Sequence, residues 1–172
     1  MQALLGAVDR LSQTVGLSVA HFYFVCALIT AYEVIMRYVF HAPTLWAFEV
    51  VMVVCACAWA LSGAYVTMRN SHISITVVYQ YSKGKARWWL DLFHMVVTLG
   101  AMGTLGYAMY GLVEDALHTF ERSGTSFNSP EPMIIKLVLF AGVCLYCLQT
   151  LVNLIRHVSG LERPARPLPQ GE

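Results

Sequence analysis

A carboxylate and a guanidinium stand four residues apart near the end of a long apolar stretch, at Glu33 and Arg37. In a helix this spacing places both side chains on one face, where they can form an ion pair. Charged groups inside a membrane are costly unless they are paired or reach water. Arg37 can extend toward the interface, whereas Glu33 lies a turn deeper. We therefore expect the pair to face protein, either another helix of this chain or another subunit.

A second acid, Glu49, follows a short connection that contains Pro43, and it should lie near the level of Arg37. Arg37 could then bridge Glu33 and Glu49 and fix two helices as a hairpin, with Trp46 anchoring the membrane interface beside them. A structural ion cluster is the leading interpretation. A contact with a partner subunit and a proton or ion relay are the alternatives.

Two histidines, His21 and His94, lie within apolar stretches. From facing helices they could ligate a b-type haem, which would make the chain a membrane anchor of an oxidoreductase. The leading interpretation is nevertheless that both are packed or interfacial histidines, and haem ligation is the alternative. The sequence contains no nucleophile–base set, phosphate-binding loop or metal-binding triad. It therefore predicts no enzyme, no cofactor and no metal site.

All cysteines fall inside apolar stretches, at Cys26, Cys55, Cys57, Cys144 and Cys147. We expect free thiols that pack as small hydrophobic side chains. The last two have the spacing of a redox motif, but they lack the electropositive, accessible surroundings that a reactive thiol needs.

The elements that position these residues follow from the distribution of charge. Only 12% of the 172 residues are charged, against about 25% in an average soluble protein. The net charge of +1 gives no indication of a nucleic-acid partner. Segments without any Asp, Glu, Lys or Arg occupy residues 11–32, 50–68, 92–113 and 137–155. Because a spanning helix needs about 20 mostly apolar residues, the sequence predicts an all-α integral membrane protein with four transmembrane helices.

We expect one four-helix membrane domain over residues 1–162, followed by a Pro-rich, disordered tail at 163–172. The first span should be retained, because its apolar run exceeds that of a signal peptide and no cleavage site follows. Residues 72–81 are too short to span and could lie at the membrane interface. The predicted spans are about 14–40, 45–68, 88–116 and 133–157.

Lysine and arginine are unevenly divided between the two predicted sides of the membrane. One side carries Arg37, Arg122 and Lys136, and the other carries the remaining eight of the 11 basic residues. Since cytoplasmic loops are enriched in basic residues, both termini should be cytoplasmic.

Two features predict close packing between helices. Gln149 and Asn153, again four residues apart, should form interhelical hydrogen bonds. Small residues at helical spacing let helix backbones approach closely in lipid; they are Ala56, Ala60, Gly63 and Ala64 in the second span, and Gly100, Ala101, Gly103, Gly106, Ala108 and Gly111 in the third.

The section from residue 33 to 75 carries a family resemblance. It reads "EVIMRYVFHAPTLWAFE" and then, ten residues further on, "WALSGAYVTMRNSHISI". This ordered set resembles the small, DctQ-like membrane subunit of tripartite ATP-independent periplasmic (TRAP) transporters. The matching positions are Arg37-Tyr38, Pro43, Trp46, Glu49, Gly63-Ala64, Arg69 and His72-Ile73. Spans three and four match only as generic apolar helices.

The resemblance implies a multi-pass protein of the bacterial inner membrane with two partners, a large membrane subunit and a periplasmic substrate-binding protein. Such transporters take up organic acids, typically carboxylates, with an ion gradient that is usually sodium. The resemblance further implies that the small subunit is non-catalytic and braces the immobile part of the large one. A self-sufficient small exporter is a further alternative, but Glu33 lies too near one end of its span to serve as a central acidic residue.

Overall fold

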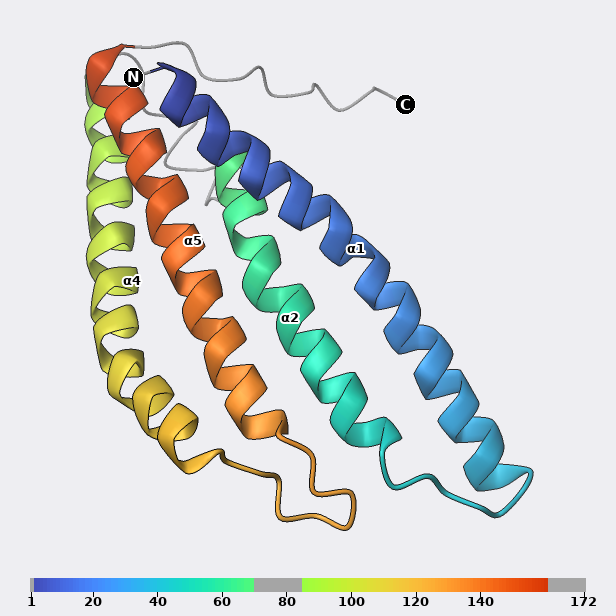
Figure 1. Ribbon diagram of the computed structural model, residues 1–172. Coiled ribbons are helices and arrows are strands. Elements are labelled where there is room, and N and C mark those ends of the chain that lie inside the picture. Colours follow the sequence, from blue (N-terminus) through green and yellow to red (C-terminus); the bar gives the residue numbers. More distant parts are fainter. Residues whose placement is uncertain (1, 70–84, 161–172) are drawn as a thin grey trace, which may run out of the picture.

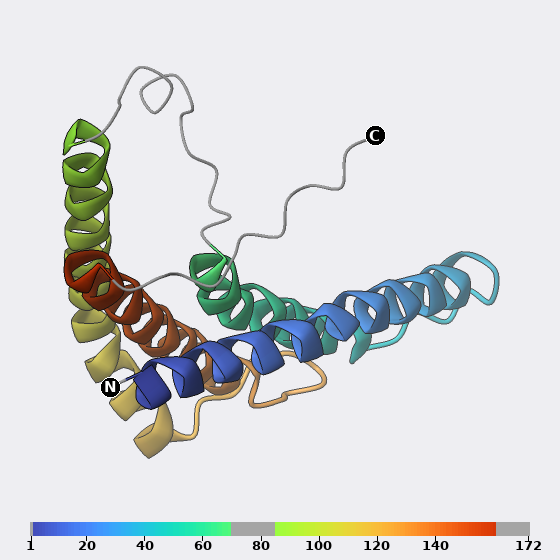
Figure 2. The same cartoon turned by 90° about the horizontal axis from the view of Figure 1, so that it is seen from above.

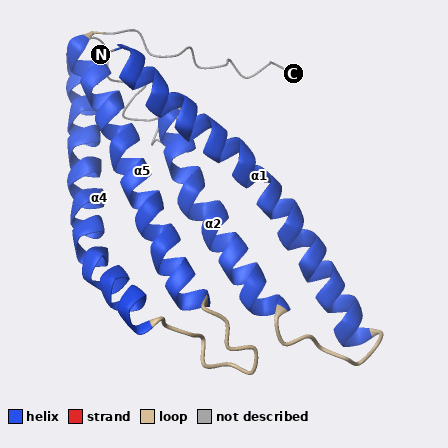
Figure 3. Ribbon diagram, viewed as in Figure 1, coloured by secondary structure: helices blue, strands red, loops and turns tan. Residues whose placement is uncertain are grey.

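The computed structural model describes residues 2–69 and 85–160, and within these two ranges every regular element is an α-helix (Figures 1 and 3). All four helices are long and apolar enough to cross a membrane. The predicted all-α class with four spans is confirmed. The helices are α1 (Gln2–Tyr38), α2 (Ala47–Met68), α4 (Lys85–Thr119) and α5 (Glu131–Ser159).

The helices form a layer in which α5 and α2 lie in the middle and α4 and α1 lie at the two edges (Figure 1). Helix α1 also meets α5, because it crosses the layer obliquely with its first turns against the end of α5. Viewed from above, α4 and α1 diverge strongly (Figure 2). The core therefore follows the α1–α2, α2–α5 and α4–α5 contacts and does not surround a central bundle axis.

The start of α1 and the end of α5 lie at the same end of the layer, which we call the terminal end (Figure 1). The connections at residues 39–46 and 120–130 lie at the opposite end, which we call the hairpin end (Figures 1 and 3). Polar side chains gather at both ends, and the apolar stretches lie between them.

Helix α1 differs most from the predicted bounds, because it begins at Gln2 and not near residue 14. Its 37 residues give a length of about 55 Å at 1.5 Å per residue, against a hydrocarbon core of about 30 Å. A helix of this length fits a membrane by tilting or by extending beyond it. The other helices agree with the predicted spans to within a few residues. The expected interfacial segment at 72–81 and the expected tail at 163–172 fall outside the described residues.

Close backbone contact joins α2 to its two neighbours. A Cβ added at Gly142 of α5 would lie 2.5 Å from the carbonyl oxygen of Ala60 in α2. A Cβ added at Gly16 of α1 would lie 2.4 Å from Cβ of Tyr65 in α2. The contact at Ala60 agrees with the prediction for the second span, whereas Gly16 and Gly142, the glycines that permit these two contacts, were not predicted.

The prediction that small residues allow close helix packing is largely wrong for α4 within this chain. A Cβ added at Gly106 would lie 3.4 Å from Val143, but one added at Gly100, Gly103 or Gly111 would meet no atom of the described residues within 4 Å. The reason is that α4 occupies an edge of the layer and contacts α5 along one face only.

Candidate functional site

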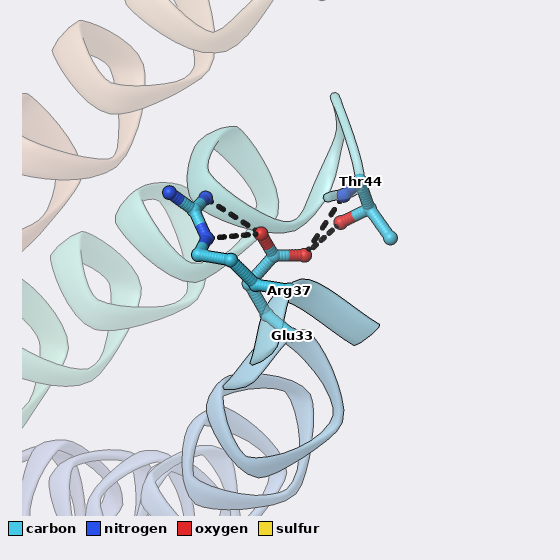
Figure 4. Close-up of polar contacts among 3 residues, drawn as sticks. All are labelled: Glu33, Arg37 and Thr44. Atoms are coloured by element: carbon cyan, nitrogen blue, oxygen red, sulfur yellow. Dashed lines mark hydrogen bonds and ion pairs between the residues drawn. The ribbon is translucent and has the colours of Figure 1, made fainter. Parts of the chain in front are cut away.

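The first polar cluster joins the end of α1 to the connection that follows it (Figure 4). Arg37 donates hydrogen bonds from Nη2 and Nε to Oε1 of Glu33, over 2.7 and 3.2 Å. The other carboxylate oxygen, Oε2, accepts hydrogen bonds from the backbone N–H of Thr44, over 3.1 Å, and from its hydroxyl. Glu33 is therefore bonded at both oxygens, and the predicted Glu33–Arg37 ion pair is confirmed. The expectation that the pair faces protein holds within the described residues for Glu33, which is 16% exposed, but not for Arg37, which is 53% exposed.

Local geometry brings Thr44 back to α1. Helix α1 ends with the backbone N–H groups of Val39 and Phe40 both bonded to the carbonyl oxygen of Ile35. His41 follows with φ of 52°, a left-handed conformation that reverses the chain. The connection then runs back past Glu33 before α2 begins. Thr44 had no sequence pattern that marked it as the partner of Glu33.

Glu49 lies in a second, separate cluster. It is 2% exposed, and its carboxylate accepts hydrogen bonds from the hydroxyls of Ser123, Thr125 and Ser129 and from the backbone N–H of Ser129. All three residues belong to the connection between α4 and α5. The expected bridge from Arg37 to Glu49 is therefore wrong, because Glu49 in the first turn of α2 faces the 120–130 connection and Arg37 pairs with Glu33 alone among the described residues.

Glu49 should be the anchor of the 120–130 connection. Glu49→Ala would leave three hydroxyls without their acceptor, and hydrogen bonds to a charged group contribute about 1.5–3 kcal/mol each. We expect faster hydrogen exchange and faster proteolysis in residues 120–130, with a loss of stability of about 3 kcal/mol. Glu114→Ala, which removes an exposed acid of α4, is the control and should leave both readouts unchanged. Equal exchange rates in both variants would contradict the anchoring role.

The same connection is held at a second point. Nζ of Lys136 in α5 forms an ion pair with Oε2 of Glu121. The backbone N–H of Ser123 bonds to the carbonyl oxygen of Ser129 over 2.9 Å and closes the loop on itself. The connection is thus tied to α2 through Glu49 and to α5 through Lys136.

The third polar cluster lies at the terminal end and joins α1 to α5. Arg156 forms a 2.6 Å ion pair with Asp9, and the side chains are 9% and 17% exposed. Gln149 is fully buried; it accepts a 2.8 Å hydrogen bond from Ser12 and donates a 2.9 Å hydrogen bond to Asp9. The first turns of α1 are therefore fixed to α5 through buried polar bonds.

Helix α2 joins this cluster through its last turn. Asn153 donates from Nδ2 to the backbone carbonyl oxygen of Thr67 over 2.9 Å, and its own Oδ1 lies 3.4 Å from Nε2 of Gln149. The prediction that Gln149 and Asn153 form interhelical hydrogen bonds is confirmed. Their partners were not predicted, although Asp9 and Ser12 share a helix face at a spacing of three. Asn153 and Arg156 likewise continue the face of Gln149.

The other residues that carry the family resemblance lie near these clusters or outside the part of the chain that the structure describes. Tyr38 is the last residue of α1 and is 71% exposed. Trp46 precedes α2 and stacks on Tyr32 with ring centroids 6.1 Å apart. Pro43 is exposed in the connection, and Arg69 lies over the ring of Tyr65 at 5.0 Å. His72 falls outside the described residues.

The structure does not bring the two candidate haem ligands together. His21 belongs to α1 and His94 to α4, and α5 and α2 lie between these helices (Figure 1). His21 is exposed, and its Nδ1 lies 3.2 Å from the carbonyl oxygen of Leu17 in its own helix. Within residues 2–69 and 85–160, no group of three or more His, Cys, Asp or Glu side chains could hold a metal ion.

The cysteines are free thiols, as predicted. Cys26 of α1 and Cys55 of α2 face each other with their sulfur atoms 3.4 Å apart. Cys144 and Cys147 line an open groove of about 350 Å³ between α4 and α5, together with Gly103, Gly106, Tyr107 and Phe140 among others. Among the described residues the lining of this groove carries no charge, and its polar side-chain groups are the hydroxyls of Tyr107 and Tyr110 and the two thiols.

One comparison with known proteins identifies the family. Residues 26–160 match the family model described as "Tripartite ATP-independent periplasmic transporters, DctQ component". A search of curated proteins found no match to the chain. The matched range includes the clusters around Glu33 and Glu49 and the α5 half of the terminal-end cluster, whereas Asp9 and Ser12 precede it. Since the match spans most of the chain and the four apolar helices suit a multi-pass membrane protein, this chain belongs to the DctQ family, the small membrane components of TRAP transporters.

Proposed function

We propose that this chain acts as the non-catalytic brace of a TRAP transporter. It would hold the immobile part of the large membrane subunit while that subunit takes up an organic acid, typically a carboxylate, driven by an ion gradient, typically sodium. A periplasmic binding protein would deliver the substrate. The observation that carries this proposal is that polar side chains tie the helices to one another at the terminal end and hold both connections against the helices at the hairpin end.

The distribution of polar groups supports a brace more than a carrier. In the described residues every fully buried side-chain nitrogen and oxygen has a hydrogen-bond partner within the chain. These groups therefore already hold the chain together. The groove between α4 and α5 has an apolar lining. A transport site in a membrane protein usually needs polar groups or broken helices near the middle of the bilayer, and the helices here are continuous.

The orientation of the brace follows from its basic residues. We propose that both termini are cytoplasmic, because eight of the 11 lysines and arginines belong to that side of the predicted topology. The hairpin end would then be periplasmic. The 120–130 connection, fixed by Glu49 and Lys136, would face the compartment of the binding protein.

Reconstitution tests this proposal directly. Liposomes containing this chain together with the large subunit should take up substrate when the binding protein and an ion gradient are present, and liposomes containing this chain alone should not. Uptake by this chain alone would contradict the brace and favour a small exporter. A Soret band in the purified chain that is lost in His94→Ala would favour the haem anchor instead.

A further inference from the structure

Arg37 has hydrogen-bonding capacity that its partner Glu33 does not use. A guanidinium carries five N–H donors, and the two bonds to Glu33 come from Nε and Nη2. Figure 4 shows the third nitrogen pointing away from both Glu33 and Thr44. Among the described residues, the only ion pair of Arg37 is the one with Glu33. One edge of the guanidinium is therefore open.

Glu33 does not depend on Arg37 alone. Thr44 supplies two of the four hydrogen bonds that the carboxylate accepts. The side chain of Glu33 is 16% exposed, whereas that of Arg37 is 53% exposed. The carboxylate is thus enclosed by its partners, and the positive charge is presented outward. An anion that approached Arg37 from outside would meet the open edge and not the carboxylate.

The position of Arg37 along α1 gives the chemistry of that anion. Helix α1 ends one residue later, at Tyr38, and the stacked rings of Tyr32 and Trp46 lie beside this end. Tyrosine and tryptophan gather at the level of the lipid headgroups. One turn inward and on the same side of the helix as Arg37, Val34 is 49% exposed, so an acyl chain can lie against it. Arg37 therefore stands where lipid phosphates lie.

We propose that the open edge of Arg37 binds the phosphate of a phospholipid in the leaflet at the hairpin end. Arginine suits this ligand because its planar fork can donate two parallel hydrogen bonds to a phosphate. The ligand class is a phosphodiester headgroup, with the acyl chains along the exposed side chains of α1. A carboxylate of the large subunit would fit the same edge electrostatically, but the neighbouring aromatic rings and apolar surface favour lipid.

The test is titration of the full-length chain in detergent with phosphatidylglycerol, followed by native mass spectrometry. The key variants are Arg37→Gln and Glu33→Gln. If Arg37 serves only to pair with Glu33, both variants should bind phosphatidylglycerol with the same affinity. If it binds phosphate, Arg37→Gln should weaken the tightest lipid-binding event about tenfold or more, whereas Glu33→Gln should retain it, because the guanidinium remains.

Three further samples keep the result interpretable. The double variant Glu33→Gln/Arg37→Gln leaves no unpaired carboxylate, so it should fold and still show the weakened lipid binding. Arg122→Gln removes another exposed arginine of the hairpin end, one that donates to the carbonyl oxygen of Asn128, and it should bind lipid as the unaltered chain does. Diacylglycerol, which lacks the phosphate, should show no difference between the variants.

Two outcomes would overturn the proposal. The first is unchanged binding of phosphatidylglycerol by the double variant. The second is unchanged lipid binding by the Arg37 variants together with loss of the large subunit from the purified complex, which would assign the open edge to a protein contact.

Discussion

Arg156→Ala is expected to destabilise the chain by about 3–5 kcal/mol, because removing one partner of a buried ion pair leaves the other charge uncompensated. Asp9 would lose its 2.6 Å ion pair and would keep, among the described residues, one hydrogen bond from Gln149. The first turns of α1 should then detach from α5. Thermal unfolding in detergent measures the loss, and hydrogen exchange in residues 2–13 locates it.

The matched control for this ion pair is the double variant Asp9→Asn/Arg156→Met. It removes both charges and keeps similar side-chain volumes, so most of the stability should return. Lys85→Ala, an exposed basic residue at the same end of the layer, should change stability by less than about 0.5 kcal/mol. A single Arg156→Ala variant as stable as the double variant would mean that the pair does not hold α1.

Gly142→Ala should have the second large effect. Its new Cβ would lie 2.5 Å from the carbonyl oxygen and 2.9 Å from Cβ of Ala60, and neither atom belongs to a flexible side chain that could move aside. Helices α2 and α5 would have to separate, at a cost of about 3 kcal/mol. The separation should also lengthen the Asn153–Thr67 hydrogen bond at the terminal end.

Gly103→Ala provides the comparison for this substitution, because an added Cβ there meets no atom within 4 Å in the part of the chain that the structure describes. It should be neutral or stabilising by up to about 1 kcal/mol, since alanine favours helix over glycine. Both variants can be measured by thermal unfolding and by yield of the complex with the large subunit. Equal stability of the two would show that α2 and α5 leave room for a side chain at Gly142.

The clusters at the two ends of the layer have different consequences for a brace. The terminal-end cluster joins α1, α2 and α5 through bonds among the helices themselves. The hairpin end relies on connections, with Thr44 held by Glu33 and the 120–130 connection held by Glu49. Substitutions at the terminal end should therefore disturb the helix layer, whereas substitutions at the hairpin end should loosen the loops and leave the helices in place.

The sequence alone determined the number of spans, the helix class and the family resemblance. This was possible because a lipid environment leaves few choices: long segments without charge must be helices, and each backbone polar group must be bonded within its own helix. It also predicted the Glu33–Arg37 pair and the bonding role of Gln149 and Asn153, because spacing within a helix fixes which side chains share a face.

Only the tertiary structure decided which helices meet and which residues complete each polar cluster. The sequence placed Glu49 with Arg37 because the connection between them is short, but the rotation of α2 turns Glu49 toward Ser123, Thr125 and Ser129. Likewise, Asp9 and Arg156 are nearly the whole chain apart and meet because α1 crosses α5. Partners of this kind depend on helix rotation and crossing, which are set by the packing of small residues such as Gly16 and Gly142 and not by any local pattern.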